Sequence, residues 1–219
     1  GDCFAGLYWK APSAGSQNVL ARYGDAGKVA AECDVTVAVL GINKSIEREG
    51  QDRFTLELPI DQQEFIKELY KVNPNTVVVL VAGSSLAVNW MDENVPAILN
   101  AWYPGEQGGN AVAEVLFGDY NPGGRLPLTY YNSLDEIPAF DNYSVKGRTY
   151  QYFEGQPLYE FGYGLSYTKF RYKSKGVSVA QDTVKVRFEV SNPEKYDGDE
   201  VEQVYVKYPE TGTSMPLKQ

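Results

Sequence analysis

Runs of aliphatic and β-branched residues alternate along the chain with segments of helical periodicity. The clearest runs are residues 35–40 and 76–82, and a third strand-like run occupies residues 97–103. Unbroken apolar runs of this length are typical of strands buried on both faces of a sheet. Between the first two, apolar residues recur at helical spacing: Ile60, Phe65, Ile66, Leu69 and Tyr70. A short helix is expected before the third run and another at about residues 109–117. This order predicts an α/β fold, a mainly parallel sheet sandwiched by helices.

The two ends of the chain have different patterns. Residues 4–9 are strand-like, and residues 17–32 have roughly helical spacing that two glycines weaken. From residue 119 the chain consists of turn and strand material. Residues 183–190 and 200–208 alternate with period two around a turn at residues 192–199, which predicts an antiparallel hairpin at the start of an all-β sandwich.

Composition excludes several kinds of chemistry. The 219 residues contain no histidine, so Ser-His-Asp catalysis and His-ligated zinc are excluded within this chain. The net charge of −9 argues against a nucleic-acid partner. Cys3 and Cys33 make no disulfide framework, and no apolar run approaches membrane-spanning length. The chain begins in mid-pattern without a methionine or a signal peptide, so we expect a mature or excised fragment.

The most informative polar segment follows the first predicted strand directly: residues 45–59, S-I-E-R-E-G-Q-D-R-F-T-L-E-L-P. If this segment is extended, Glu47 and Glu49 share one side, and Gly50 lets the backbone bend just past Glu49. Carboxylates presented in this way can serve as general acids and bases. The same pattern is also typical of a solvated loop with surface ion pairs, and these residues alone leave both interpretations open.

Two other loops are expected at the same edge of the sheet. Residues 83–85 follow the second predicted strand, and residues 104–109, P-G-E-Q-G-G, follow the third. Ligand sites in parallel sheets lie beyond the carboxyl ends of the strands. This agreement favours a functional role for the carboxylate loop, although P-G-E-Q-G-G itself is more typical of a tight turn and helix start.

Several motifs together resemble the C-terminal part of a family 3 glycoside hydrolase. They are E-R-E-G-Q-D-R, L-P-x-x-Q-Q-E-F-I, the long run Y-P-G-E-Q-G-G-N-A-V-A-E-V-L-F-G-D-Y-N-P-G-G-R-L-P-L-T-Y, G-R-T-Y-Q-Y-F and L-Y-E-F-G-Y-G-L-S-Y-T. The resemblance covers residues 30–219 and is greatest to the β-xylosidase and β-glucosidase group. It divides the chain into four parts. Residues 1–13 are a possible tail of a PA14-like insertion, and residues 14–135 form the α/β sandwich domain. Residues 136–170 are an extended linker, and residues 171–219 form an incomplete fibronectin III-like domain.

The resemblance implies a retaining, exo-acting glycosidase with two catalytic carboxylates and no cofactor or metal. By its position before G-x-D-R, Glu49 matches the acid/base residue of the family, with Glu47 as the second choice. Asp52 and Arg53 are expected to hold the loop. The nucleophile would come from an N-terminal barrel domain of the same enzyme. The implied substrate is a β-xyloside, β-glucoside or related oligosaccharide, with no nucleic-acid or membrane partner and a secreted or periplasmic location.

Two alternatives remain open at this point. The chain could be a carbohydrate-binding or scaffold module with no chemistry of its own. The second alternative is a Rossmann-type nucleotide enzyme, but the run V-V-V-L-V-A-G-S-S lacks the G-x-G-x-x-G pattern.

Overall fold

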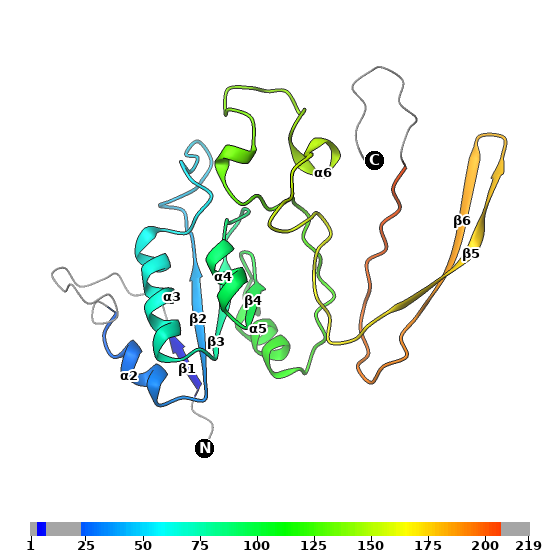
Figure 1. The fold of residues 1–219 in the computed structure, drawn as a ribbon. Coiled ribbons are helices and arrows are strands. Elements are labelled where there is room, and N and C mark those ends of the chain that lie inside the picture. Colours follow the sequence, from blue (N-terminus) through cyan, green and yellow to red (C-terminus); the bar gives the residue numbers. More distant parts are fainter. Residues whose placement is uncertain (1–3, 8–22, 207–219) are drawn as a thin grey trace.

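The predicted parallel sheet is present in the computed structural model, which describes residues 4–7 and 23–206. Four strands lie in the order β1-β2-β3-β4, and every neighbouring pair is parallel (Figure 1). The strands are β1 (Phe4–Leu7), β2 (Val35–Gly41), β3 (Thr76–Val81) and β4 (Ala97–Asn100). The fold class expected from the alternating pattern is therefore confirmed for this part of the chain.

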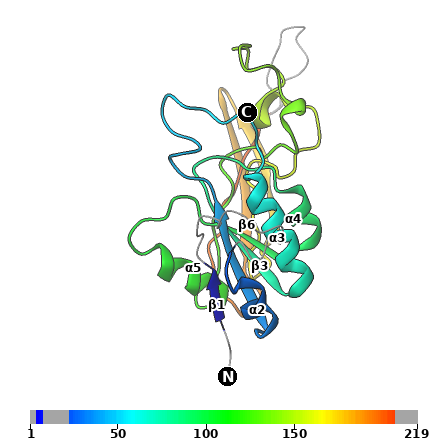
Figure 2. The ribbon, with the colours of Figure 1, turned by 90° about the vertical axis from the view of Figure 1, so that its left-hand side faces the viewer.

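Helices lie on both sides of this sheet, and the core lies between the sheet and the helices of one side. Figure 2 shows α2 (Ala26–Ala31), α3 (Ile60–Val72) and α4 (Asn89–Asn94) on one side of the sheet and α5 (Gly108–Phe117) on the other. The core contains Ala38 and Leu40 of β2, Val78 and Leu80 of β3, and Phe65, Ile66 and Leu69 of α3. Ile60 was expected in the same stripe of α3 but is 69% exposed, because it is the first residue of the helix.

The end of α3 is fixed by one buried amide, Asn73. Its Nδ2 atom donates to the carbonyl oxygens of Ala30 (3.0 Å) and Cys33 (2.8 Å) and approaches Thr36 Oγ1 (3.2 Å). Because backbone carbonyls at a helix end need partners when they are buried, this amide joins the end of α2 to the start of β2.

The first and last strands of the sheet differ from the sequence expectation. Residues 4–7, which fall in the predicted tail at residues 1–13, pair in parallel with β2 and form the edge strand of the α/β sheet. The rest of that range lies outside the described residues, as does much of the helix expected at residues 17–32. The domain boundaries stay a prediction. The third predicted strand ends at Asn100 and not at residue 103, because Trp102 adopts a left-handed φ of 54° that turns the chain out of the sheet.

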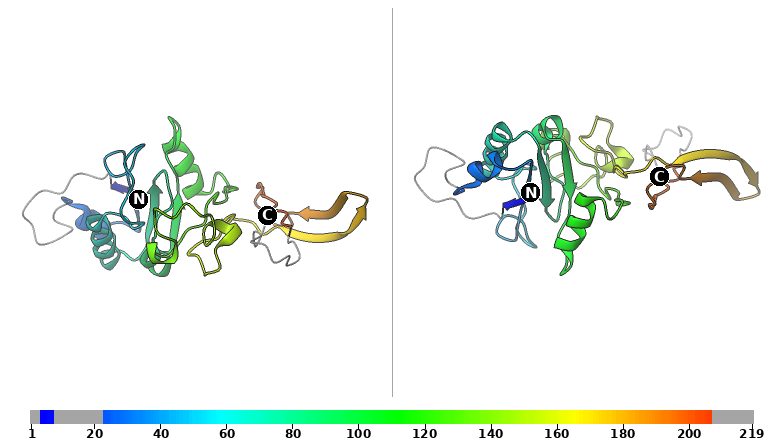
Figure 3. Two further views of the ribbon diagram at one scale, coloured as in Figure 1. Left: turned by 90° about the horizontal axis from the view of Figure 1, so that it is seen from above. Right: turned by 90° about the horizontal axis from the view of Figure 1, so that it is seen from below.

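The C-terminal part contains an antiparallel hairpin of β5 (Arg171–Ala180) and β6 (Thr183–Ser191), which extends away from the α/β part (Figure 3). The predicted pairing of residues 183–190 with 200–208 is wrong, since residues 200–206 form no strand. The two-residue loop Gln181 and Asp182 brings β5 and β6 together at a smaller entropic cost than closing the longer turn. The fibronectin III-like sandwich stays a prediction. Of the helices described, none is long and apolar enough to cross a membrane.

We predict that Ile66→Ala destabilises the chain by about 2–5 kcal/mol, because Ile66 is fully buried and truncation leaves a cavity in the core. The matched control is Ile60→Ala on the same helix, which should change the free energy of unfolding by less than about 0.5 kcal/mol. Urea denaturation followed by circular dichroism measures both. An equal loss for the two variants would contradict this packing of α3.

Candidate functional site

The candidate site lies at the carboxyl edge of the sheet, where the loop at residues 42–59 leaves β2. Gln62 of α3 closes the end of β2: its Nε2 donates to Gly41 O (2.8 Å), and Gly41 N donates to its Oε1 (2.9 Å). Gly41 cannot be replaced easily, because a Cβ there would lie 1.8 Å from the carbonyl oxygen of Val81. The starting point of the loop is therefore fixed by backbone packing and by one glutamine.

A nearly buried arginine holds the middle of this loop against the end of β3. The side chain of Arg53 is 9% exposed, and its Nε donates to Glu47 Oε2. Its Nη2 donates to Ser84 Oγ (3.0 Å) and to the carbonyl oxygen of Ser85 (2.8 Å). Ser84 Oγ in turn donates to Glu47 Oε2 (2.8 Å). Arg53, Glu47 and Ser84 thus form a closed network that joins two loops of the same edge.

Glu49 lies outside this network, on a tight turn. Arg48 N donates to Gln51 O (3.0 Å) and Gln51 N donates to Arg48 O (2.9 Å), so Glu49 and Gly50 are the two corner residues. Gly50 has a φ of 74°, the bend that its lack of a side chain permits. Glu49 is exposed, and within the described ranges no hydrogen bond or ion pair reaches its carboxylate.

The segment is consequently not extended, and Glu47 and Glu49 do not share a side. Asn43 begins a turn in which its carbonyl oxygen accepts from the backbone N–H groups of Ile46 and Glu47. This turn directs Glu47 toward Arg53, while the following turn carries Glu49 into solvent. Asp52, expected to help hold the loop, is exposed, and the hydrogen bonds of the network come from Arg53.

The third loop of this edge also reaches β2. Tyr103 follows β4, and its Oη donates to the carbonyl oxygen of Ile42 (3.2 Å). Its ring passes so close to Gly83 that a Cβ on this glycine would lie 2.5 Å from Tyr103 Cε2. The loops after β2, β3 and β4 therefore meet at one edge, as the parallel topology predicts. P-G-E-Q-G-G forms a turn, with Gly108 N donating to Gly105 O (3.0 Å), and then begins α5.

A buried phenol lies behind the network. Tyr130 is 3% exposed, and its Oη accepts from Asn100 Nδ2 (3.1 Å) at the end of β4. Burial raises the pKa of Tyr130 to about 12, while the hydrogen bond from Asn100 and the positive charge of Arg53 act in the opposite direction. Tyr130 is thus neutral at ordinary pH and packs at the end of β4.

Sequence reasoning identified the loop and placed residues 83–85 at the same edge, but it assigned no role to three residues that shape the site. The sequence gives no separate signal for Ser84, Gln62 or Tyr103. A serine after a strand and a glutamine in a helix are common, and Tyr103 is one of many tyrosines in this chain. Only the clustering of polar residues after parallel strands pointed toward them. No group of three His, Cys, Asp or Glu side chains placed to hold a metal ion occurs in the part of the chain that the structure describes.

Comparison with known proteins identifies the family. The model of the "Glycosyl hydrolase family 3 C-terminal domain" matches residues 8–167. A xylan 1,4-beta-xylosidase of Xylanibacter ruminicola is 44% identical over 160 residues, which are 72% of this chain and 18% of that protein. A periplasmic beta-glucosidase of Salmonella typhimurium is 35% identical and matches 99% of this chain but 30% of its own length.

The fold agrees with these matches. The crystal structure of a beta-glucosidase from Kluyveromyces marxianus superimposes with a TM-score of 0.84 at 33% identity, covering 94% of this chain and 27% of that one. The chain therefore spans less than a third of the length of these relatives. It belongs to the family of C-terminal domains found in family 3 glycoside hydrolases.

Proposed function

We propose that this chain is the C-terminal part of a retaining, exo-acting β-glycosidase and that Glu49 is its acid/base residue. The substrate would be a β-xyloside or a β-glucoside, the two classes named in its relatives. The observation that carries the proposal is the difference between the two carboxylates of one loop. Glu47 is engaged in the network at the base of the loop, and Glu49 is presented at its exposed turn.

The contacts of Glu47 favour Glu49 for proton transfer. An acid/base residue has to donate a proton and regain it in every catalytic cycle. Glu47 Oε2 already accepts from Arg53 and Ser84, so proton exchange there would break the contacts that hold the loop. Glu49 can exchange a proton with a substrate at no cost to the network, while the network fixes the loop that carries it.

The proposed reaction needs a second carboxylate, supplied by an N-terminal barrel domain of the same enzyme. That carboxylate would attack the anomeric carbon while Glu49 protonates the departing glycosidic oxygen. The resulting glycosyl-enzyme would then be hydrolysed by a water molecule from which Glu49 removes the proton. This restores both carboxyl groups to their starting states.

The location of the parent enzyme is part of the same proposal. One relative is named as periplasmic, which supports action outside the cytoplasm. Glycosidases that release single sugars from oligosaccharides would meet such substrates there.

In the parent enzyme, Glu49→Ala should slow hydrolysis most for substrates with poor leaving groups, by roughly 10²–10⁴-fold, because these depend on protonation of the leaving oxygen. Kinetics on a series of aryl glycosides measure this dependence, and azide should partly restore turnover on activated substrates. Asp52→Ala is the control, since Asp52 is an exposed neighbour outside the network. A leaving-group dependence for Glu47→Ala but not for Glu49→Ala would reverse the assignment.

The two glutamates should also differ in their effect on stability. Glu47→Gln should lower the free energy of unfolding of the chain by about 1–3 kcal/mol, because it removes the charge that faces the nearly buried Arg53. Glu49→Gln should change it by less than about 0.5 kcal/mol. Urea titration compares them, and equal losses would show that the turn residue also has a structural role.

We expect the isolated 219-residue chain to hydrolyse neither aryl β-xylosides nor aryl β-glucosides at enzymatic rates. A retaining mechanism needs two carboxyl groups about 5 Å apart. A sensitive fluorogenic assay provides the measurement, with the Glu49→Gln chain as the blank. If the unchanged chain hydrolysed these substrates and the Glu49→Gln chain did not, the chain would contain its own nucleophile.

A further inference from the structure

The hairpin of β5 and β6 carries a charge of opposite sign to the rest of the chain. Residues 171–191 contain five Lys and Arg against two carboxylates, a net charge of +3 in a chain with a net charge of −9. Both strands are exposed along their whole length. The hairpin therefore holds five of the 20 Lys and Arg residues of an acidic chain on one accessible element.

The register of the hairpin separates apolar and basic residues onto opposite faces. Residues directly opposite one another share a face, and these pairs include Tyr172 with Val190, Val177 with Val186, and Val179 with Val184. Successive residues alternate between faces, except at the bulge between Ser174 and Gly176. The other face, which we call the basic face, consists of Arg171, Lys173, Lys175, Lys185, Arg187 and Glu189 together with smaller polar residues.

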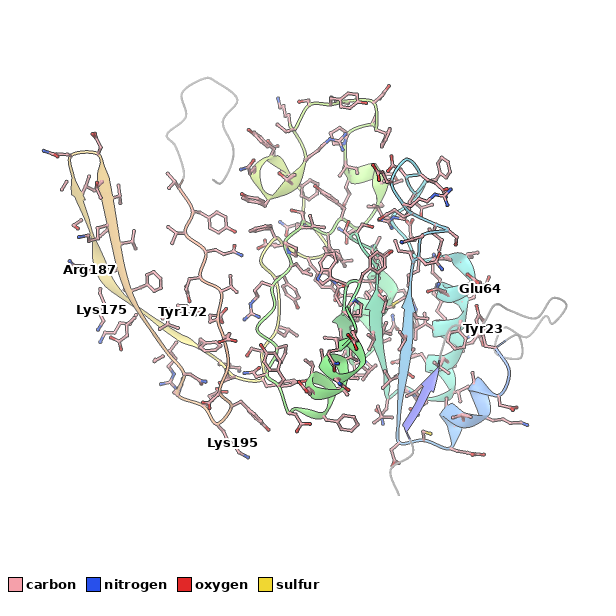
Figure 4. All side chains as sticks on the ribbon, turned by 180° about the vertical axis from the view of Figure 1, so that it is seen from behind. Tyr23, Glu64, Tyr172, Lys175, Arg187 and Lys195 are labelled. Atoms are coloured by element: carbon pink, nitrogen blue, oxygen red, sulfur yellow. The ribbon has the colours of Figure 1, made fainter. Side chains whose placement is uncertain are left out.

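The basic face is regular along β6, whereas on β5 a bulge between Ser174 and Gly176 interrupts it. Side chains two residues apart on one strand lie about 7 Å apart, and neighbouring strands lie about 5 Å apart. Lys175 forms an ion pair with Glu189 across the hairpin, although both side chains stay largely accessible (43% and 53%). Lys175 and Arg187 lie close together near the middle of the hairpin, where Arg187 pairs with Gly176 (Figure 4).

We propose that the basic face binds an anionic polysaccharide, a sugar chain that carries carboxylate groups along its length. An anionic polysaccharide can lie extended along the two strands, so that its successive carboxylates meet successive cations of the basic face. Arginine and lysine donate charge-assisted hydrogen bonds to carboxylates. The sugar nature of the partner rests on the proposed glycosidase function, whereas its negative charge follows from the face itself.

Two features of the hairpin favour a polysaccharide over other polyanions. Its aromatic residues, Tyr172 and Phe188, are on the apolar face, so the basic face offers no stacking platform for nucleic-acid bases. Its only apolar side chain is that of Ala180, opposite Thr183, and a single methyl group is too small to insert among lipid tails. The serine and threonine residues on this face, Ser178 and Thr183, can bind sugar hydroxyl groups.

The test is binding of the 219-residue chain to polygalacturonate, measured by titration calorimetry at two salt concentrations, with neutral β-1,4-xylan as the uncharged comparison. We expect binding to polygalacturonate alone. The double variant Lys185→Gln with Arg187→Gln should weaken it roughly tenfold. It should also make the dependence of log K on log salt shallower by roughly 1.5, because two ionic contacts are lost.

The control variant carries Lys44→Gln and Lys146→Gln, which remove the same charge from exposed loops elsewhere, and it should bind like the unchanged chain. A second variant, Lys185→Arg, keeps the charge and should keep the affinity. Equal weakening by the control, or no binding at all, overturns the proposal. Binding to a single-stranded oligonucleotide or to phosphatidylserine vesicles that equals binding to polygalacturonate overturns the choice of partner. Hydrolysis of aryl glycosides by the parent enzyme is measured separately, so a failure of the glycosidase proposal is distinguishable from a failure of this one.

Discussion

The arrangement of the candidate site depends on the need to satisfy one nearly buried guanidinium. Arg53 has four acceptors: Glu47 Oε2, the hydroxyl of Ser84, and the carbonyl oxygens of Leu56 and Ser85. A cation removed from water is costly unless its donors are paired. If the loop after β2 moved away from the end of β3, the donors of Arg53 would lose their acceptors and its charge would be left unpaired. This requirement fixes the base of the loop.

Two fixed points on the loop explain why its exposed turn is free. Gln62 holds Gly41 at the beginning of the loop, and Arg53 holds its middle. Glu49 lies between them on a turn whose only internal bonds join Arg48 and Gln51. A side chain on such a turn has a defined position but few contacts of its own, so a substrate or a neighbouring domain can become its partner. Placing Glu47 and Glu49 in one loop thus separates holding the loop from presenting a carboxylate.

The sequence predicted the sheet and the location of the loop well, for a simple physical reason. Buried parallel strands need unbroken apolar runs, and parallel topology brings their carboxyl ends together. The pairing of Glu47 with Arg53 was not predictable, because it depends on the turn that starts at Asn43. The partner of β6 was mispredicted because the alternation of β5 is interrupted by a bulge between Ser174 and Gly176, which hides its strand pattern. Residues 200–208 alternate more regularly, but pairing them with β6 would require closing a longer turn than the one between β5 and β6.

The separation of charge within the chain has a consequence for how its parts act. Neutral glycosides are indifferent to the acidic net charge of the chain, but an anionic polymer is repelled by it. At physiological ionic strength, charges are screened beyond a Debye length of about 8 Å. The hairpin extends away from the acidic α/β part (Figure 3), and Glu200 and Glu202 lie against Tyr172 on its apolar face. The basic face is the opposite face of the hairpin, so an acidic body and a basic face can coexist in one chain.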